Sequence, residues 1–279
     1  MKLKYFGTAA AEGWPGLFCD CDACRRARAA GGRNIRTRSQ AIIDDCLLID
    51  FPADTYMHVL YGGLDLTKVS SCLITHTHED HFYPLDFGNR REGFAYLRPD
   101  KPFFTVYGSE TVGHEMKSVI ETVGTARVNF APMQKFETAV IDGYEVTALA
   151  ADHDPNSGCV IYMIGDGNKT MLYANDTGYF PEETWTYLID RTKEGRLRFD
   201  YVSIDCTGGL GAQYQRGHMG TEAAASVRER LLTAGCADRD TVFCLHHFSH
   251  NGKAIYDELV GPAAEMGFLV SYDGMEVEI

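Results

Sequence analysis

Three histidines and two acidic residues crowd into one short segment, Thr75-His76-Thr77-His78-Glu79-Asp80-His81. An apolar run with the composition of a β-strand comes directly before it, so His76 and His78 point to the same side of an extended chain. Two imidazoles on one side can bind one metal ion. If the chain then turns, Asp80 and His81 can face a second metal beside the first. The spacing therefore predicts a metal site rather than a helix-capping loop that happens to be rich in histidine.

Further ligands must come from elsewhere in the chain, because one loop cannot complete two coordination spheres. His153, Asp176 and His247 each stand where an apolar run ends. Each has an ordinary alternative; for example, Asp176 could be a turn residue and His153 a solvated loop histidine. Because all three follow predicted strands, a shared site with the histidine segment is favoured.

A second cluster lies near the start of the chain, where Cys19, Cys21 and Cys24 supply three thiols. They are too close in sequence for easy mutual disulfides, so a fourth ligand must come from far away. Tetrahedral zinc accepts three cysteines and one histidine, and His250, shortly after His247, is the best candidate. Such a closed site would be structural and would tie the N-terminal loop to the loop that bears His247. The alternative is a set of free loop cysteines.

The histidine segment and the later single ligands resemble the metallo-β-lactamase-fold hydrolases along the whole chain. The resemblance implies an α+β fold, a four-layer αββα sandwich with the metal site at one edge of the sheets. It also implies a ligand set: His76, His78 and His153 for one metal, Asp80, His81 and His247 for the other, and Asp176 as the bridge. The aspartate suits hydrolases and phosphodiesterases, since true β-lactamases often have cysteine at the matching position. His78 sets the redox di-iron branch aside, because those proteins have glutamate there.

The cysteine segment with His250 narrows the resemblance to the phosphoribosyl cyclic phosphate phosphodiesterase branch. Gly217-His218, before a predicted helix, is similar to the loop of that branch whose histidine assists cleavage of the phosphate ester. The alternative for His218 is an ordinary capping-loop histidine. The segment 7–15 departs from that branch and is similar instead to the pyrroloquinoline quinone biosynthesis relatives, which share the cysteine site. This departure concerns the substrate and leaves the expected fold unchanged.

The amino-acid composition limits the kinds of protein that this chain can be and the partners that it can bind. The chain has 279 residues, 45% hydrophobic and 23% charged, which is enough for a sizeable core. We expect a single domain over residues 1–279, with a small zinc-binding loop at about 19–24. The net charge of −13 argues against a nucleic-acid or anionic-membrane partner. With no transmembrane run, no secretory signal and an odd number of cysteines, we expect a cytoplasmic protein, and a homo-oligomer is compatible with the sequence.

Short apolar runs recur along the chain and predict the strands that must position these ligands. Their β-branched and aromatic content is typical of strands, and polar clusters end them. The predicted strands lie at 1–7, 41–44, 47–50, 71–75, 103–107, 144–148, 158–163, 170–174, 201–205 and 241–245. A helix is clearest over 221–233, ahead of Gly235, and others are expected after His81, over 109–123 and over 253–266. Strands mixed with helices favour stacked sheets flanked by helices.

We therefore expect a dinuclear metal-dependent hydrolase, and we favour a phosphodiesterase for a small cyclic or ribose-linked phosphate ester. Two divalent metals, zinc or manganese or otherwise iron, would hold a hydroxide for in-line attack, with Asp80 in the catalytic set. His218 would protonate the leaving group. A third metal, zinc, would fill the cysteine site. The alternatives are a tRNA 3′-processing nuclease, against which the acidic charge weighs, and a cofactor-biosynthesis protein of the pyrroloquinoline quinone type.

Other features near these motifs each allow two interpretations. Asp205 either orients a ligand histidine or opens the glycine-rich turn at 208–211, and the turn is slightly favoured. That turn lacks the lysine of a nucleotide-binding loop and is a weak phosphate cradle. Tyr83, Asp86 and Arg90 could line the mouth of the pocket. An arginine run could contact an anionic substrate, although a solvated helix face is favoured; its members are Arg25, Arg26, Arg28, Arg33, Arg36 and Arg38.

Overall fold

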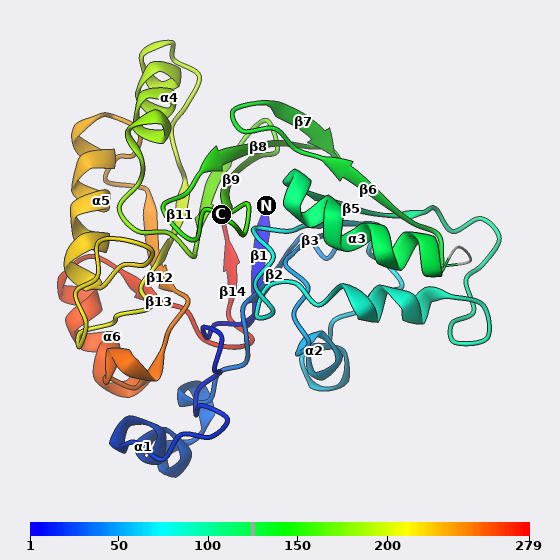
Figure 1. Ribbon diagram of the computed structural model, residues 1–279. Helices are drawn as coiled ribbons and strands as arrows, with labels where there is room; N and C mark the ends of the chain where they lie inside the picture. Colours follow the sequence, from blue (N-terminus) through cyan, green and yellow to red (C-terminus); the bar gives the residue numbers. More distant parts are fainter. Residues whose placement is uncertain (124–125) are drawn as a thin grey trace.

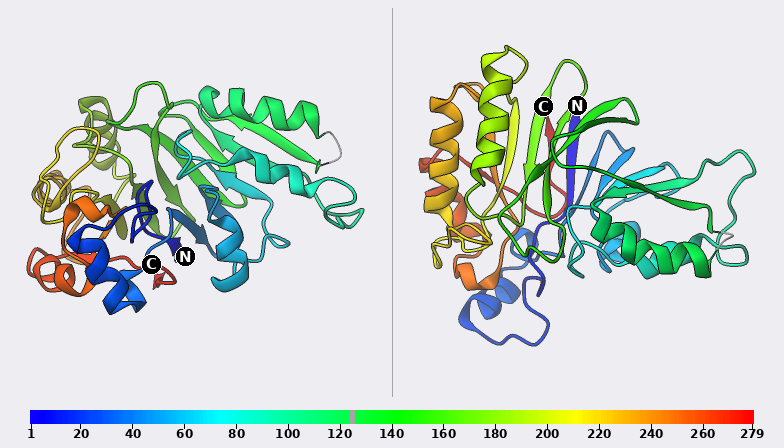
Figure 2. Two further views of the ribbon diagram at one scale, coloured as in Figure 1. Left: turned by 60° about the horizontal axis from the view of Figure 1, so that its bottom comes forward. Right: turned by 45° about the horizontal axis from the view of Figure 1, so that its top comes forward.

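The computed structural model describes residues 1–123 and 126–279. Two seven-stranded sheets face each other, and helices cover the outer face of each sheet (Figure 1, Figure 2). This is the α+β, four-layer αββα sandwich that the sequence predicts. No helix among the described residues has the length and apolar character needed to cross a membrane.

The first sheet consists of β1 (Lys2–Gly7), β2 (Gln40–Ile43), β3 (Leu47–Ile49), β4 (Ser71–Leu73), β5 (Phe104–Gly108), β6 (Val128–Pro132) and β14 (Glu276–Glu278). The second consists of β7 (Thr138–Ile141), β8 (Tyr144–Ala150), β9 (Val160–Gly165), β10 (Thr170–Ala174), β11 (Tyr201–Asp205), β12 (Val242–His246) and β13 (Leu269–Val270). The helices are α1 (Asp22–Ala30), α2 (Thr55–Tyr61), α3 (Glu110–Thr122), α4 (Glu182–Lys193), α5 (Thr221–Thr233) and α6 (Tyr256–Glu265). Short 3-10 turns are η1 (Gly32–Asn34), η2 (Pro84–Arg90) and η4 (His250–Gly252).

Strand order places several carboxyl ends at the same edge of each sheet. The first sheet runs β14-β1-β2-β3-β4-β5-β6, and the second runs β13-β12-β11-β10-β9-β8-β7. Neighbours from β3 to β6 are parallel, as are neighbours from β10 to β13. The turns after parallel strands therefore gather at one edge, which is where open α/β sheets place their sites.

Side chains alternate between two cores along each strand, as the pleat requires. Ile43 and Tyr173 lie in the core between the sheets. Ile42 faces outward to the core that α3 covers, and Leu172 faces outward to the core beneath α4, α5 and α6. Both sheets are therefore buried on their two faces, which explains why their central strands are apolar throughout.

The expected elements and the observed ones differ mainly at the margins of the sheets. The strands predicted at 170–174 and 201–205 coincide with β10 and β11, and the helix predicted over 221–233 coincides with α5. The missed strands β6, β7, β13 and β14 are all edge strands, whose partly exposed faces leave no clear apolar run. Helices α1, α2 and α4 were also not anticipated. After His81 the chain forms only the 3-10 turn η2, which starts at Pro84.

One buried hydrogen bond joins the two sheets directly beneath the histidine segment. The hydroxyl of Tyr162, on β9, donates to the carbonyl oxygen of Ile74, just after β4, at 2.7 Å. Both residues are fully buried. The bond therefore holds the end of β4 against the second sheet at the point where the predicted metal ligands begin.

We expect Tyr162→Phe to lower the free energy of unfolding by about 1–3 kcal/mol, because the Ile74 carbonyl would stay buried without its donor. Equilibrium urea unfolding measures this. The matched control is Tyr56→Phe on α2, where the ring is 65% exposed. Equal stability of the two variants would show that the cross-sheet bond contributes nothing measurable.

Candidate metal centre and active site

The residues predicted as ligands stand in turns that follow strands. His76 and His78 follow β4, His153 follows β8, Asp176 follows β10 and His247 follows β12. Asp176 and His247 have φ angles of 53° and 61°, a left-handed conformation that is uncommon for residues other than glycine. Such backbone strain clusters at functional sites.

The structure brings four of these residues into a first ligand group: His76, His78, His153 and Asp176. Their ligand atoms all lie within 4.8 Å of one another. Nε2 of His76 is 3.1 Å from Oδ2 of Asp176, and Nε2 of His153 is 3.8 Å from the same oxygen. Nδ1 of His78 lies 3.2 Å from Nε2 of His153.

A second ligand group contains Asp80, His81, Asp176 and His247, again with ligand atoms within 4.8 Å. Nε2 of His81 is 3.1 Å from Oδ2 of Asp176, and Nδ1 of His247 is 2.7 Å from Oδ1 of Asp176. Asp80 completes the group, with Oδ2 at 3.3 Å from Nε2 of His81. Asp176 belongs to both groups, the position expected of a bridge, although the ligand roles themselves stay predictions.

The donor atoms fit two divalent ions. Nε2 of His76 and Oδ1 of Asp176 are buried, and neither forms a hydrogen bond of good geometry among the described residues, although Oδ2 of Asp176 lies 3.1 Å from the first and Nδ1 of His247 lies 2.7 Å from the second. Buried polar atoms are rarely left unsatisfied, so an ion at this place would explain both. A mixture of imidazole nitrogen and carboxylate oxygen suits zinc, manganese or iron.

Asp50 orients one of the ligand histidines and was not anticipated from the sequence. It follows β3, which pairs with β4, and it is fully buried. Nδ1 of His81 donates to its Oδ2 at 2.7 Å, while the backbone N–H of Thr75 donates to Oδ1 at 2.8 Å. The bond fixes the tautomer of His81 and leaves Nε2 for a metal. The available signal was an aspartate that closes an apolar strand.

Two other ligand histidines are held in the same way. Nδ1 of His153 donates to the carbonyl oxygen of Gly217 at 2.8 Å. Nε2 of His78 pairs with Oδ2 of Asp154 at 3.3 Å. In each ring the opposite nitrogen is the one that faces the first ligand group, so the outer contacts select the atom that can bind.

Burial and neighbouring charges shift the pKa values of several residues in the site. Burial disfavours protonation of His81, but the carboxylates of Asp176 and Asp80 outweigh it and raise the pKa of His81 well above its usual value. Burial opposes ionisation of Asp176, yet neighbouring His247 holds the pKa of this carboxyl well below its usual value. Burial, reinforced by His81, lowers the pKa of His76 to about 3. Asp176 is therefore charged and His76 neutral, the forms that bind metals, whereas His81 would have to release the proton on Nε2 when a metal binds.

His218 lies beside the ligand groups and is anchored from behind. Its ring centroid is 4.8 Å from that of His153, and its Nδ1 donates to Oδ2 of Asp205 at 3.0 Å. Asp205 also accepts the backbone N–H groups of Thr207 and Met219, at 3.0 and 2.8 Å. Burial opposes the shift, but His218 lowers the pKa of Asp205 to about 2. Asp205 thus shapes the glycine-rich turn, the interpretation slightly favoured from the sequence, and also orients His218, a histidine outside the two ligand groups.

A cleft of about 280 Å³ opens onto these groups. Its walls are Ala10, Ala11, Glu12, His78, Asp80, His153, Asp176, Thr207, Tyr214, His218, His247, Ser249 and Asn251. Glu12, Tyr214 and Asn251 carried no recognisable signal in the sequence, because loops distant along the chain bring them here. Tyr83, Asp86 and Arg90, suggested as lining the mouth, are absent from these walls; Arg90 lines a different cavity.

The arginine run does not reach the cleft. Arg25 pairs with Asp20, Arg26 with Glu258 and Arg38 with Asp54. The other members also have internal partners: Arg28 donates to Cys19, Arg33 to Tyr256 and Tyr272, and buried Arg36 to Thr8 and Ser271. No member lines the cleft, and the favoured interpretation, a solvated helix face with acidic neighbours, fits Arg25 and Arg26 on α1 but was wrong for Arg36, which is buried against the core.

The glycine-rich turn serves packing rather than phosphate binding. A Cβ at Gly208 would lie 1.8 Å from the carbonyl oxygen of Ala212, and one at Gly209, whose φ is 49°, would lie 3.0 Å from that of Gly252. The glycines therefore let this turn close tightly and approach η4, as its weak resemblance to a phosphate cradle suggested.

The cysteine cluster forms as predicted in space, with Cys19, Cys21, Cys24 and His250 presenting ligand atoms within 4.8 Å. Nδ1 of His250 is 3.7 Å from Sγ of Cys19 and 3.5 Å from Sγ of Cys21. Despite its partial burial, hydrogen bonds from its neighbours, the Cys24 N–H foremost, lower the pKa of Cys21 to about 6. A thiolate is the form that binds zinc, but burial raises the pKa of Cys24 to about 12, so this thiol would have to lose its proton when a metal binds. The placement of the four ligand atoms fits the closed site expected of the cluster, although its metal stays a prediction.

Comparison with known proteins bears on the fold and the family. The model of the β-lactamase superfamily domain matches residues 51–247. A diphosphatase of the PhnP family has a TM-score of 0.73 at 20% identity, over 100% of this chain and 97% of that one. Zinc-bound PqqB from Methylobacterium extorquens has a TM-score of 0.75 at 19% identity, over 100% of both chains. The short form of human tRNase Z has a TM-score of 0.64 at 14% identity, over 100% and 99%.

No curated protein sequence matches the chain. The structural likenesses, all at low identity, show the fold, while the family model reaches from the turn after β3 to His247, the last predicted ligand of the dinuclear site. Sequence pattern, layered architecture and family match agree: the chain belongs to the β-lactamase superfamily of metal-dependent hydrolases.

Proposed function

We propose that this protein is a phosphodiesterase that hydrolyses a small cyclic or ribose-linked phosphate ester, with two divalent metals in the two ligand groups. The observation that carries the proposal is the placement of His218. It lines the cleft beside His153, and Asp205 holds its Nδ1, so Nε2 is the nitrogen left for a substrate. A proton donor next to a dinuclear site suits the departure of an alkoxide from phosphorus.

The roles of the ligand residues follow from their positions. Asp176 would be shared by both metals, with the two groups of histidines and Asp80 on either side of it. When bound, the metals would supply Lewis acidity and lower the pKa of a water molecule towards neutrality. Asp50 keeps His81 in one tautomer throughout, and Asp205 does the same for His218.

The cleft favours a small substrate over a polyanion. Its walls include no lysine or arginine among the described residues, so positive charge for one phosphate group would come from the metals. A tRNA would need additional cationic contacts along its backbone, and the net charge of −13 opposes them. The nuclease function therefore ranks second, despite the fold that this chain shares with tRNase Z.

We further propose that the cysteine cluster holds a structural zinc. Four ligands that close around one ion leave no open position for substrate. Nε2 of His250 lies 3.4 Å from Oε1 of Glu12, which leaves Nδ1 towards the thiols. Glu12 also lines the cleft, so the cluster supports one of its walls.

We expect metal-loaded protein to hydrolyse small phosphodiesters and to leave thioesters and lactones unchanged, because a proton donor beside a dinuclear site suits the departure of an alkoxide from phosphorus. A substrate panel on metal-analysed protein measures this. The panel includes a diphosphate, since one structural neighbour is a diphosphatase, and a tRNA gel shift at two salt concentrations. Turnover of thioesters or lactones alone would refute the phosphodiesterase, and tight salt-dependent tRNA binding would favour the nuclease.

His218→Ala should lower kcat on an alkyl or ribose phosphodiester by about 10²–10⁴-fold, as loss of a general acid does. The same variant should lose far less activity on a p-nitrophenyl ester, whose leaving group needs no proton. His114→Ala, an exposed histidine on α3, is the matched control and should change neither rate. Equal losses on both esters would assign His218 to binding or structure rather than proton donation.

Metal analysis should find about three metals per chain, two in the open groups and one zinc among the cysteines. Cys21→Ser should remove one metal and leave two, since serine is a poor zinc ligand. Cys46→Ser, a half-buried cysteine outside the cluster, should retain all three. Only two metals in the unmodified protein, with Cys19, Cys21 and Cys24 titrating as free thiols, would contradict the closed site.

A further inference from the structure

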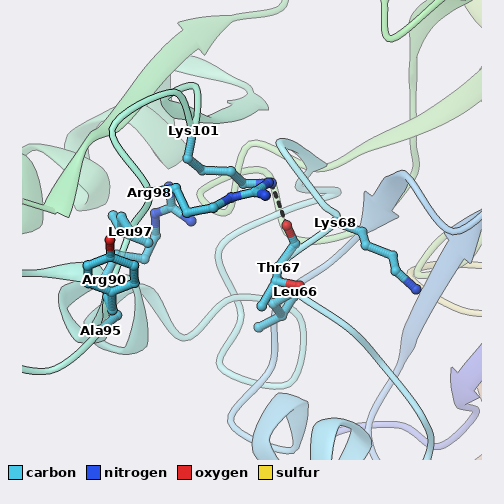
Figure 3. Close-up of a pocket in the computed structure, with 9 residues that line it drawn as sticks. Leu66, Thr67, Lys68, Arg90, Ala95, Leu97, Arg98 and Lys101 are labelled. Carbon is cyan, nitrogen blue, oxygen red and sulfur yellow. Dashed lines mark hydrogen bonds between the residues drawn. The ribbon is translucent and has the colours of Figure 1, made fainter.

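A second cavity, of about 600 Å³, lies away from the metal cleft (Figure 3). It lies between the turn that precedes β4 and the loop that leads from η2 to β5. Both segments stand at the amino ends of their parallel strands, whereas His76 follows the carboxyl end of β4. The cavity is therefore at the opposite edge of the first sheet from the metal ligands. Its walls are Leu66, Thr67, Lys68, Arg90, Ala95, Tyr96, Leu97, Arg98 and Lys101.

The lining of this cavity is positively charged, whereas the protein as a whole is negatively charged. Four of its nine lining residues are cationic, and none of the described lining residues is acidic, in a chain of net charge −13. Two carboxylates outside the lining pair with two of these cations: Asp65 with Lys68 at 3.4 Å, and Asp100 with Nε of Arg98 at 3.8 Å. Four cations against two carboxylates leave the cavity with an excess of positive charge, which favours an anion.

Two of these cationic side chains have N–H groups that can donate hydrogen bonds to an anion. Lys101 uses one of its three N–H groups on the carbonyl oxygen of Thr67, at 2.5 Å, a bond that also joins the two walls (Figure 3). The side chain of Arg98 is 72% exposed, and its guanidinium forms no hydrogen bond to another described residue. In Figure 3 the ends of Arg98 and Lys101 converge beside Thr67. A guanidinium fork next to an ammonium group suits a phosphate monoester.

The rest of the lining is apolar and includes an exposed aromatic ring. Leu66, Ala95 and Leu97 form part of the wall, and Tyr96 is 89% exposed. A free phosphate ion would use none of this surface. A planar base could stack on the tyrosine, an interaction that tolerates any base.

We propose that this cavity is a second binding site, distinct from the metal cleft, for a small phosphate ester that carries an apolar or aromatic group, of the nucleoside monophosphate class. The phosphate lies between Arg98 and Lys101, and the base lies against Tyr96 and the leucines. The site requires no hydrolysis, since none of its residues belongs to either ligand group. It stands independently of the reaction at the metals.

Calorimetric titration of metal-loaded protein with AMP at low ionic strength tests the site, with adenosine and inorganic phosphate as partial ligands. Arg98→Ala/Lys101→Ala should weaken AMP binding at this site by at least about tenfold, because two charge-assisted contacts are lost. Tyr96→Ala, which retains both cations, should weaken AMP binding but leave phosphate binding unchanged. Adenosine should bind more weakly than AMP.

The control is Lys193→Ala/Arg239→Ala, which removes two exposed charges elsewhere, the side chains being 70% and 92% exposed. It should bind AMP like the unmodified protein. Hydrolysis of bis(p-nitrophenyl) phosphate reports separately on the metal cleft and should be equal in all variants. Unchanged AMP affinity in Arg98→Ala/Lys101→Ala, or equal binding of adenosine and AMP, would overturn the second site whatever the outcome for hydrolysis.

Discussion

A carboxylate that is almost fully withdrawn from water is the constraint on which this structure depends. Asp176 is 1% exposed and stands between two groups of imidazoles, and its Oδ1, although 2.7 Å from Nδ1 of His247, forms no hydrogen bond of good geometry among the described residues. Burying a charge without compensation is costly enough that the group normally neutralises instead. The surrounding histidines supply part of the compensation, and divalent ions would supply the rest. Its left-handed backbone shows that the chain accepts strain to place this group.

The histidines can compensate the buried charge of Asp176 only if each ring turns the correct nitrogen towards the site. Asp50 fixes His81, and the carbonyl of Gly217 fixes His153. These partners come from β3 and from the loop before α5, elements that carry no ligand of their own. The site is nevertheless a property of both sheets: each of these partners follows a strand of the same sheet as its histidine, and stacking the sheets brings the two sets of ligands together around Asp176. A chain with the same ligands in an open arrangement would bind ions less selectively.

Much of the fold and the first ring of ligands could be predicted, because both leave local patterns. Apolar runs ending in histidine or aspartate mark buried strands with polar ends, and that pattern located His76, Asp176 and His247. Asp50 left only a common strand-end aspartate, whose importance depends on β3 pairing with β4. Arg36 was expected to be exposed but is buried, because nothing in the local sequence distinguishes the two cases. Its guanidinium carbon lies 4.1 Å from the centre of the Phe248 ring. The edge strands were not predicted for a similar reason, because half-exposed strands have a composition similar to that of loops.

The loop after β12 links the cysteine cluster to the cleft, because it carries residues of both. His247 belongs to a metal group, and His250, one turn further on, belongs to the cysteine cluster. Between them, the hydroxyl of Ser249 donates to Glu12, a carboxylate that also approaches His250 and lines the cleft. Closing the cysteines around an ion would therefore restrict the backbone that carries His247. A structural metal in this position would act on catalysis by removing conformational freedom from a ligand loop, without contacting the substrate.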